Sequence, residues 1–240
     1  MVRAGARGLS PKASPRVEEY LETIYMLAEE RQPVIGARLA ELLGVSRATV
    51  TMMLQRMARD GLVVLDSRKQ VTLTAKGQAL AEASMRRHRL IERFLTDVLG
   101  FDWARSDVEA HNLEHCISAE VEAALNRFLG YPSRCPHGNP IPGNPPPADL
   151  DLEQPLDSLP VGACGRVARV AEPVENALAV LQYVQERGIR PGVGLKVLDY
   201  GPRGDSLVVL VGERPVSLGR DIARFVFVVP ETAPERSTVS

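Results

Sequence analysis

A proline-rich segment in the middle of the chain constrains the fold more than any other feature. Seven of the 17 residues from Tyr131 to Pro147 are proline. Proline has no amide N–H to donate and its ring clashes with a helix interior, so this segment cannot be helical. We therefore expect a linker at about residues 138–150. It separates a first part with helical periodicity from a second part made of short strands.

The first part contains the pattern of a helix-turn-helix. Two short amphipathic helices lie within Val34–Arg59, separated by Gly44-Val45 and restarted by Ser46 as N-cap. The small and hydroxylic residues at the start of the second helix would let it enter a major groove of double-stranded DNA. The residues predicted to face the DNA are Ser46, Arg47, Ala48, Thr49, Thr51, Met52, Gln55 and Arg56.

The flanking segments complete a winged helix. Residues 1–15 are expected to form a disordered basic tail, followed by an amphipathic helix from Pro15 to about Glu30. After the helix-turn-helix, Leu62–Leu65 and Val71–Thr74 predict a hairpin whose tip, with Arg68 and Lys69, suits phosphate contact. We assign residues 16–80 to a DNA-binding domain.

The charge distribution agrees with this assignment. Residues 1–90 carry 15 Lys and Arg against 9 Asp and Glu, a net charge of +6, whereas residues 91–240 carry 14 against 21, a net charge of −7. A basic first part and an acidic second part fit a nucleic-acid module joined to a cation-binding module.

The densest group of metal-ligand side chains lies between Asp107 and His115. The spacing places Asp107, His111, Glu114 and His115 along one face of a helix. Two imidazoles and two carboxylates on one face suit a divalent cation, although a solvated polar face is the plainer alternative. The same residues match the H-x-x-E-H signature of inverted zinc proteases, so a zinc hydrolase is a rival hypothesis.

Two long helices are expected around this group. One runs from Ala75 to Leu99 and places His88 and Glu92 four residues apart, and one runs from about Asp102 to Leu129. The apolar face of the second helix is broad enough to pack on a second subunit. We assign residues 81–137 to a helical dimerisation and metal-binding domain.

The second part, residues 151–240, has the pattern of an SH3-like barrel, with short strands separated by glycine-rich turns and one helix from Val174 to Arg187. The expected fold class is mainly α with a β-rich C-terminal module. Its three parts are a winged helix-turn-helix, a helical dimerisation and metal-binding domain, and the barrel.

Composition narrows the cellular setting. Cys116, Cys135 and Cys164 form no C-x-x-C pair, so neither a disulfide framework nor a zinc ribbon is expected. No apolar run is long enough for a membrane span and the N-terminus lacks a signal-peptide core. We therefore expect a cytoplasmic protein with no membrane partner.

Four stretches together resemble the diphtheria toxin repressor and manganese transport regulator family of metal-dependent transcriptional regulators, three-domain type. They are Glu18–Tyr25, Met85–Glu92, Leu113–His115 and Cys135–Pro142. The resemblance covers about residues 15–230. It implies a homodimer that binds an operator in double-stranded DNA, represses genes for metal uptake and has no enzymatic activity. It identifies the barrel as a FeoA-like domain.

The resemblance also implies two metal sites. The primary site maps to Glu19, Glu22, His88, His111, Glu114 and His115. A secondary site maps to His88, Glu92 and Asp107 in some members. In others it maps to Glu92, Cys135 and His137 with a carboxylate from the barrel, here Glu172 or Glu175.

The expected metal follows from the donor atoms. A primary site of carboxylates and imidazoles without thiolate suits Mn(II) or Fe(II), and Zn(II) or Co(II) would substitute in vitro. We favour Mn(II). His111 departs from the family, whose iron-responsive members tend to have Cys there and whose manganese-responsive members tend to have Glu. Asp107 replaces a His, which weakens or remakes the site that contains it.

Two alternatives predict different behaviour. A metalloprotease would need a substrate cleft and a further zinc ligand well downstream, and here a DNA-reading domain precedes the motif. A metal-independent repressor, whose barrel binds a partner, would bind its operator equally well in the presence of a chelator.

Overall fold

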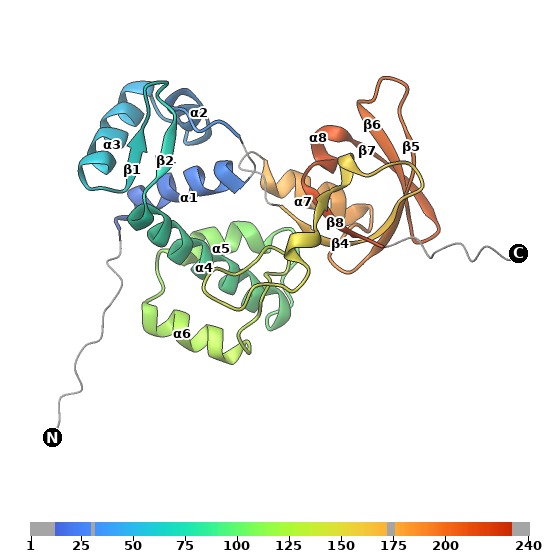
Figure 1. Cartoon of the computed structure of the whole chain (residues 1–240). Helices are drawn as coiled ribbons and strands as arrows, with labels where there is room; N and C mark the ends of the chain where they lie inside the picture. The colour runs from blue at the N-terminus through green and yellow to red at the C-terminus, as the bar shows by residue number, and fades with distance from the viewer. Residues whose placement is uncertain (1–12, 30–31, 172–175, 232–240) are drawn as a thin grey trace, which may run out of the picture.

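The computed structural model of the chain describes residues 13–29, 32–171 and 176–231. Most of the tail expected at residues 1–15 lies outside the described residues. Figure 1 shows the helical first part on one side and the β-sheet module on the other, which is the predicted fold class. Among the described residues, no helix is both long and apolar enough to cross a membrane.

The N-terminal domain is the predicted winged helix-turn-helix. Ser46 caps the recognition helix by accepting a hydrogen bond from the Thr49 amide. Tyr20, Leu39 and Met57, from three different helices, are fully buried in one apolar core. The elements are α1 (Pro15–Glu29), α2 (Gly36–Leu42), α3 (Arg47–Arg59), β1 (Val63–Leu65) and β2 (Val71–Leu73).

The middle domain corrects one prediction. The helix expected from Asp102 to Leu129 is two helices, α5 (Ser106–Glu114) and α6 (Ala119–Phe128), both of which pack on α4 (Ala75–Asp97). Helix α5 ends at its C-cap His115, and Ser118 starts α6 by accepting a hydrogen bond from the Val121 amide. A hydroxyl in this position favours a new helix start over a continuous helix.

Apolar packing inside the middle domain is sparse. Leu90 is buried with Cys135 and Ile141, and Ile91 is buried with Leu95 and Ala110, in two small clusters. Most of the remaining interior is polar and includes the fully buried carboxylate of Glu92. Because buried charges need partners, the polar groups of this domain must satisfy one another or a ligand.

The proline-rich segment is irregular, as its composition predicts, but its first half is packed. His137, Asn139 and Ile141 are buried, and Arg86 donates hydrogen bonds to the Pro142 carbonyl and the Asn144 side chain. The linker expected at residues 138–150 thus begins against α4. Its place as a domain boundary stays a prediction.

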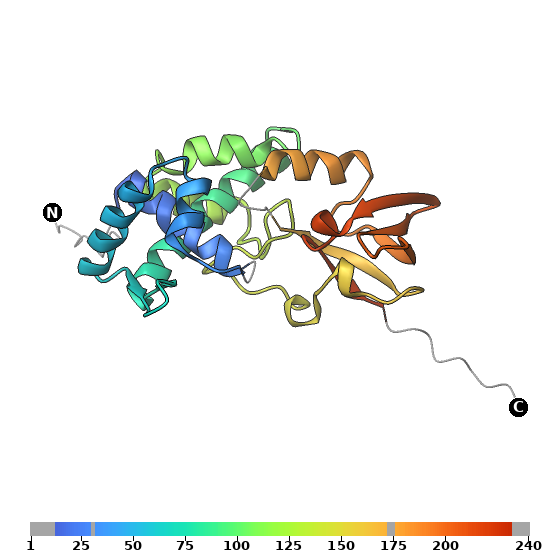
Figure 2. The same ribbon diagram turned by 90° about the horizontal axis from the view of Figure 1, so that it is seen from above.

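The C-terminal module is a six-stranded antiparallel sheet with the order β3-β8-β4-β5-β6-β7. Register shifts between Val167 and Arg169 and between Val197 and Asp199 interrupt two of its pairings, and such bulges bend a sheet toward closure. Figure 2 shows α7 alongside the middle domain, and it packs against α5. The elements are β3 (Gln154–Pro155), β4 (Cys164–Val170), α7 (Ala177–Glu186), β5 (Gly194–Tyr200), β6 (Ser206–Val211), β7 (Arg214–Gly219), α8 (Arg220–Ala223) and β8 (Val226–Pro230).

Candidate metal centre and DNA-binding surface

The imidazole of His88, on α4, lies at the centre of the polar interior. Its Nδ1 is 2.9 Å from Glu114 Oε2, and its Nε2 is 3.3 Å from both Glu92 Oε1 and Asp107 Oδ1. One ring therefore contacts carboxylates on both sides, and the potential ligands divide into two groups around it.

The first cluster joins α1 to α5. Ligand atoms of His88, His111 and Glu114 lie within 4.8 Å of one another, and so do those of Glu22, Glu114 and His115. Glu114 belongs to both groups. We call these five residues the first cluster. A cavity of about 260 Å³ borders it, with Glu19, Glu22, His88, Asp107 and His111 in its wall.

The second cluster lies between α4 and the start of the proline-rich segment. Ligand atoms of Glu92, Cys135 and His137 lie within 4.8 Å of one another, and all three residues are buried. His137 Nδ1 is 3.0 Å from Glu92 Oε1 and 3.9 Å from Cys135 Sγ. The predicted barrel ligands Glu172 and Glu175 lie outside the described residues. Glu92 also groups with His88 and Asp107, the other predicted secondary set.

Glu19 and its neighbour Glu18 occupy different positions. Glu19, predicted as a primary ligand, is one-third exposed, lies 3.5 Å from Arg16 and is absent from the ligand groups found among the described residues. Glu18 is buried, with Oε2 2.9 Å from His115 Nδ1 and Oε1 3.0 Å from Arg87. Glu18 was not among the predicted site residues, although its i+4 spacing to Glu22 puts both carboxylates on one face of α1.

Electrostatics favour the ionised form of one carboxylate in each cluster, Glu114 in the first and Glu92 in the second. Burial raises the pKa of Glu114, but the charge of His88 and hydrogen bonds from His111 and His88 outweigh it, so the pKa is about 2. Burial also raises the pKa of Glu92, yet His137 and His88 reverse the shift and lower it. Burial lowers the pKa of His88, but Glu92 and Glu114 raise it well above its usual value. A protonated imidazole thus supplies the positive charge that these carboxylates require.

The donor atoms fit a divalent cation. Within the described part of the chain, Glu92 Oε1 and Oε2, Glu114 Oε1 and Glu22 Oε1 are buried without a hydrogen bond of good geometry. Buried oxygens are normally satisfied, and oxygens with nearby imidazoles form the donor set of Mn(II), Fe(II) and Zn(II) sites. The residues present are therefore suited to hold a cation in each cluster.

The predicted DNA-facing residues share an open surface. All of them are exposed except Thr49, which is half-buried and hydrogen-bonded to the Ser46 hydroxyl. Beneath this face Val50, Leu54 and Met57 are buried, while Met53 is half-buried. Figure 1 shows α3 on the side of the domain that faces away from the sheet module. The individual roles of these residues stay predictions.

A winged helix-turn-helix joined to buried clusters of metal-ligand side chains defines a class of DNA-binding proteins that carry metal sites. Comparison with known families gives matches along most of the chain. Residues 12–71 match the iron dependent repressor N-terminal DNA binding domain, and residues 74–143 match the iron dependent repressor metal binding and dimerisation domain. Residues 154–230 match the FeoA domain.

Whole-length relatives agree. The iron-dependent repressor IdeR of Mycobacterium tuberculosis is 38% identical over 219 residues, 87% of this chain and 94% of that protein. The diphtheria toxin repressor of Corynebacterium efficiens is 38% identical over 224 residues, 87% of this chain and 93% of its own length. The chain belongs to the diphtheria toxin repressor family of metal-dependent transcriptional repressors, which are DNA-binding proteins and not enzymes, so the zinc-protease hypothesis is wrong.

Solved structures show the same architecture. A manganese-dependent transcriptional repressor in complex with manganese superposes with a TM-score of 0.78 at 35% identity, over 89% of this chain and 99% of that one. The manganese-activated repressor ScaR with bound Zn²⁺ gives 0.75 at 28% identity, over 88% of this chain and 98% of the other. Both iron-named and manganese-named proteins are therefore similar to this chain.

Proposed function

We propose that this protein is a manganese-responsive repressor in which a cation in the first cluster links α1 to the middle domain. The observation that carries the proposal is the meeting of Glu22 from α1 with Glu114 and His115 at the end of α5, with ligand atoms within 4.8 Å. Helix α1 also packs into the core of the DNA-binding domain. A cation in this cluster therefore acts on the position of the DNA-reading helix.

The coupling has a simple electrostatic origin. Burial and the nearby Glu114 raise the pKa of Glu22, because two carboxylates in one buried site repel each other. A divalent cation converts that repulsion into attraction and favours one position of α1 relative to α5. In a dimer, the two recognition helices must enter major grooves about 34–36 Å apart, so fixing α1 selects the geometry that binds DNA.

The proposed dimer uses the apolar face predicted from the sequence. Its residues lie on α5 and α6, and four of them are at least two-fifths exposed in the single chain: Val108, Leu113, Val121 and Phe128. An exposed apolar face of this kind is typical of a subunit interface. Two protomers joined through it would present two recognition helices to a palindromic operator.

Manganese is proposed over iron on donor chemistry. The first cluster holds carboxylates and imidazoles with no thiolate among its five members, and such oxygen-rich sites suit Mn(II). Cys135 belongs to the second cluster, which can accept a softer ion. Because some relatives are named for iron, Fe(II) is the second candidate. An iron-responsive protein would gain more DNA affinity with Fe(II) than with Mn(II).

The test is fluorescence anisotropy of labelled promoter DNA from a metal-uptake gene. Protein is titrated with chelator, Mn(II), anaerobic Fe(II), Zn(II) or Co(II). The proposal expects weak binding in chelator and the largest gain in affinity with Mn(II). A larger gain with Fe(II) would reassign the metal, and tight binding in chelator would contradict metal gating.

Glu19→Ala tests a third carboxylate near the cation, beside Glu22 and Glu114 of the first cluster. Because Glu19 lies in the wall of the cavity beside His88 and His111, we propose that it completes the site when the cation is bound. The variant should keep its fold and lose metal-dependent DNA binding. Unchanged metal-dependent affinity would remove Glu19 from the site and leave the first cluster as the ligand set.

A further inference from the structure

Trp103 belongs to the middle domain by sequence and to the sheet module by packing. It lies in the turn between α4 and α5, and its side chain is buried in one apolar cluster with Leu181, Val184 and Ile189 of the C-terminal module. Gln185 of α7 binds the two residues that flank Trp103 in the turn. Its side-chain N–H donates to the Asp102 carboxylate, and its side-chain oxygen accepts from the backbone amide of Ala104. The turn is therefore anchored in the module.

The same residue contacts a member of the second cluster. Nε2 of His137 donates to the Trp103 carbonyl at 2.8 Å, and the two rings meet edge to face with centroids 4.6 Å apart. The indole N–H donates to the Pro136 carbonyl at 2.9 Å, and the Ser106 hydroxyl donates to the Trp103 carbonyl. Because a carbonyl only accepts, Nε2 carries the proton, and Nδ1 is the atom directed at Glu92.

The segment that carries His137 is also fixed to the module from the other side. The Val170 amide donates to the His137 carbonyl, and the Asn139 side chain donates to the Val170 carbonyl. Gly138 has φ +91°, and a Cβ there would lie 2.2 Å from the Ala168 carbonyl oxygen. The segment therefore lies flat on β4.

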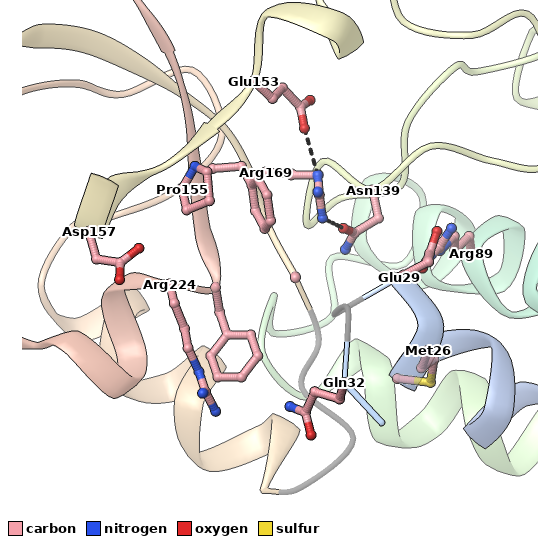
Figure 3. Close-up of a pocket in the computed structure, with 13 residues that line it drawn as sticks. Met26, Glu29, Gln32, Arg89, Asn139, Glu153, Pro155, Asp157, Arg169 and Arg224 are labelled. Atoms are coloured by element: carbon pink, nitrogen blue, oxygen red, sulfur yellow. Dashed lines mark hydrogen bonds and ion pairs between the residues drawn. The ribbon is translucent and has the colours of Figure 1, made fainter. Parts of the chain in front are cut away.

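The two parts are not in contact along their whole boundary. A cavity of about 310 Å³ lies between α1 and the module, with Met26, Arg89 and Phe227 among its lining residues (Figure 3). Arg169 stands in its wall, where it donates to Glu153 and Asn139. Beside this cavity, the two parts are held together around Trp103 and the His137 segment.

We infer that Trp103 is a positioning residue for the second cluster. It holds the imidazole of His137 in the orientation in which His137 Nδ1 binds a divalent cation together with Glu92 and Cys135. The inference rests on the proposed function only in taking the second cluster as a cation site. It ties the affinity of that site to the packing of the C-terminal module, because one side chain belongs to both.

The main test is calorimetric titration of the full chain with Mn(II), comparing wild type, Trp103→Phe and Tyr200→Phe. Trp103→Phe keeps an aromatic ring and loses the indole N–H donor, so binding to the second cluster should weaken roughly tenfold while the first equivalent is unchanged. Tyr200→Phe also removes one donor from an aromatic side chain of the module, the hydroxyl bonded to the Leu159 carbonyl, but belongs to neither the Trp103 turn nor the second cluster, and should bind both equivalents as wild type does. Circular dichroism confirms that each variant is folded.

Three results would overturn the inference: a single binding equivalent in wild type, an unchanged second equivalent in Trp103→Phe, or equal losses in Trp103→Phe and Tyr200→Phe. A different result would contradict the proposed function, namely a DNA affinity that does not change when Mn(II) is added. A selective effect of Trp103→Phe without DNA gating would support the positioning role alone.

A spectroscopic signature gives an independent reading. Trp103 is the only tryptophan of the chain, so its emission should change as the second equivalent of Mn(II) binds beside His137. Cys135→Ser leaves the contact between the two rings and removes a ligand, and should abolish that change. Emission that follows the first equivalent alone, or that is insensitive to Mn(II), would contradict the inference.

Discussion

At the scale of residues, Glu114 is the carboxylate on which the first cluster depends. It lies 2.9 Å from His88 and 3.0 Å from His111, and it groups with Glu22 of α1. Its low pKa keeps it ionised at neutral pH. No other member of the cluster is shared by both of its ligand groups in the described residues.

Glu114→Gln should therefore remove metal binding at the first cluster. The change preserves shape and deletes the charge, so we expect Mn(II) affinity to fall at least about 100-fold, beyond the loss typical of an outer-shell partner. Equilibrium dialysis measures it. Glu109→Gln, on the same helix but in neither cluster, is the matched control and should bind as wild type does. Equal affinities for the two variants would exclude Glu114 as a ligand.

Glu18 has a structural role that its neighbour lacks. Its side chain pairs with Arg87, and both side chains are less than one-tenth exposed. Glu18→Gln leaves the buried Arg87 charge poorly compensated, so the free energy of unfolding should fall by on the order of 3 kcal/mol. Glu19→Gln, at a one-third exposed position, should change it by less than about 0.5 kcal/mol. Urea denaturation of the metal-free variants checks this, and equal losses would contradict it.

The candidate ligand residues of α4 and α5 could be predicted from their spacing in the sequence. Which of them come together in one cluster depends on the fold. Spacing alone put His111, Glu114 and His115 on one helical face. It could not choose between Glu18 and Glu19, because that choice depends on how α1 is rotated against α4 and α5. The convergence of Glu92 with Cys135 and His137, more than 40 residues away, was implied by the family resemblance and not by any local pattern.

At the scale of elements, periodicity predicted α1, α3, α4 and the wing, and failed at one break. The residues between α5 and α6 have no Gly or Pro, so the pattern reads as one helix. The N-cap hydrogen bond of Ser118 and the packing of both helices on α4 decide otherwise. Similarly, composition identified the proline-rich segment as irregular, but the burial of its first half follows from long-range contacts.

The recognition helix and the wing should contribute differently to DNA binding, the helix by reading bases and the wing by contacting phosphate. Gln55 is exposed on α3 and Arg68 at the tip of the wing. Gln55→Ala should cost about 1–3 kcal/mol in specific operator binding and little on unrelated DNA. Arg68→Ala should weaken both equally and reduce the salt dependence by about one charge. Anisotropy at several salt concentrations measures both, and loss of affinity for unrelated DNA in Gln55→Ala would contradict a base-reading role.

At the scale of the whole molecule, the middle domain has buried charge where other domains have an apolar core. Binding of a cation should therefore stabilise it. At Mn(II) concentrations about 100-fold above Kd, the gain is about 2.7 kcal/mol, which corresponds to roughly 5–10 °C in Tm for a chain of this size. Calorimetry with Mn(II) and with chelator measures the shift. A Tm that Mn(II) leaves unchanged in a metal-free preparation would contradict the site.

In the proposed mechanism one cation and one operator act on the same movement of α1, so the two binding equilibria must be linked. Mn(II) affinity is measured by competition with a fluorescent chelator, with and without saturating operator DNA. We expect operator DNA to tighten Mn(II) binding by the same factor, at least about tenfold, by which Mn(II) tightens operator binding. Mn(II) affinity that is identical with and without operator would contradict it.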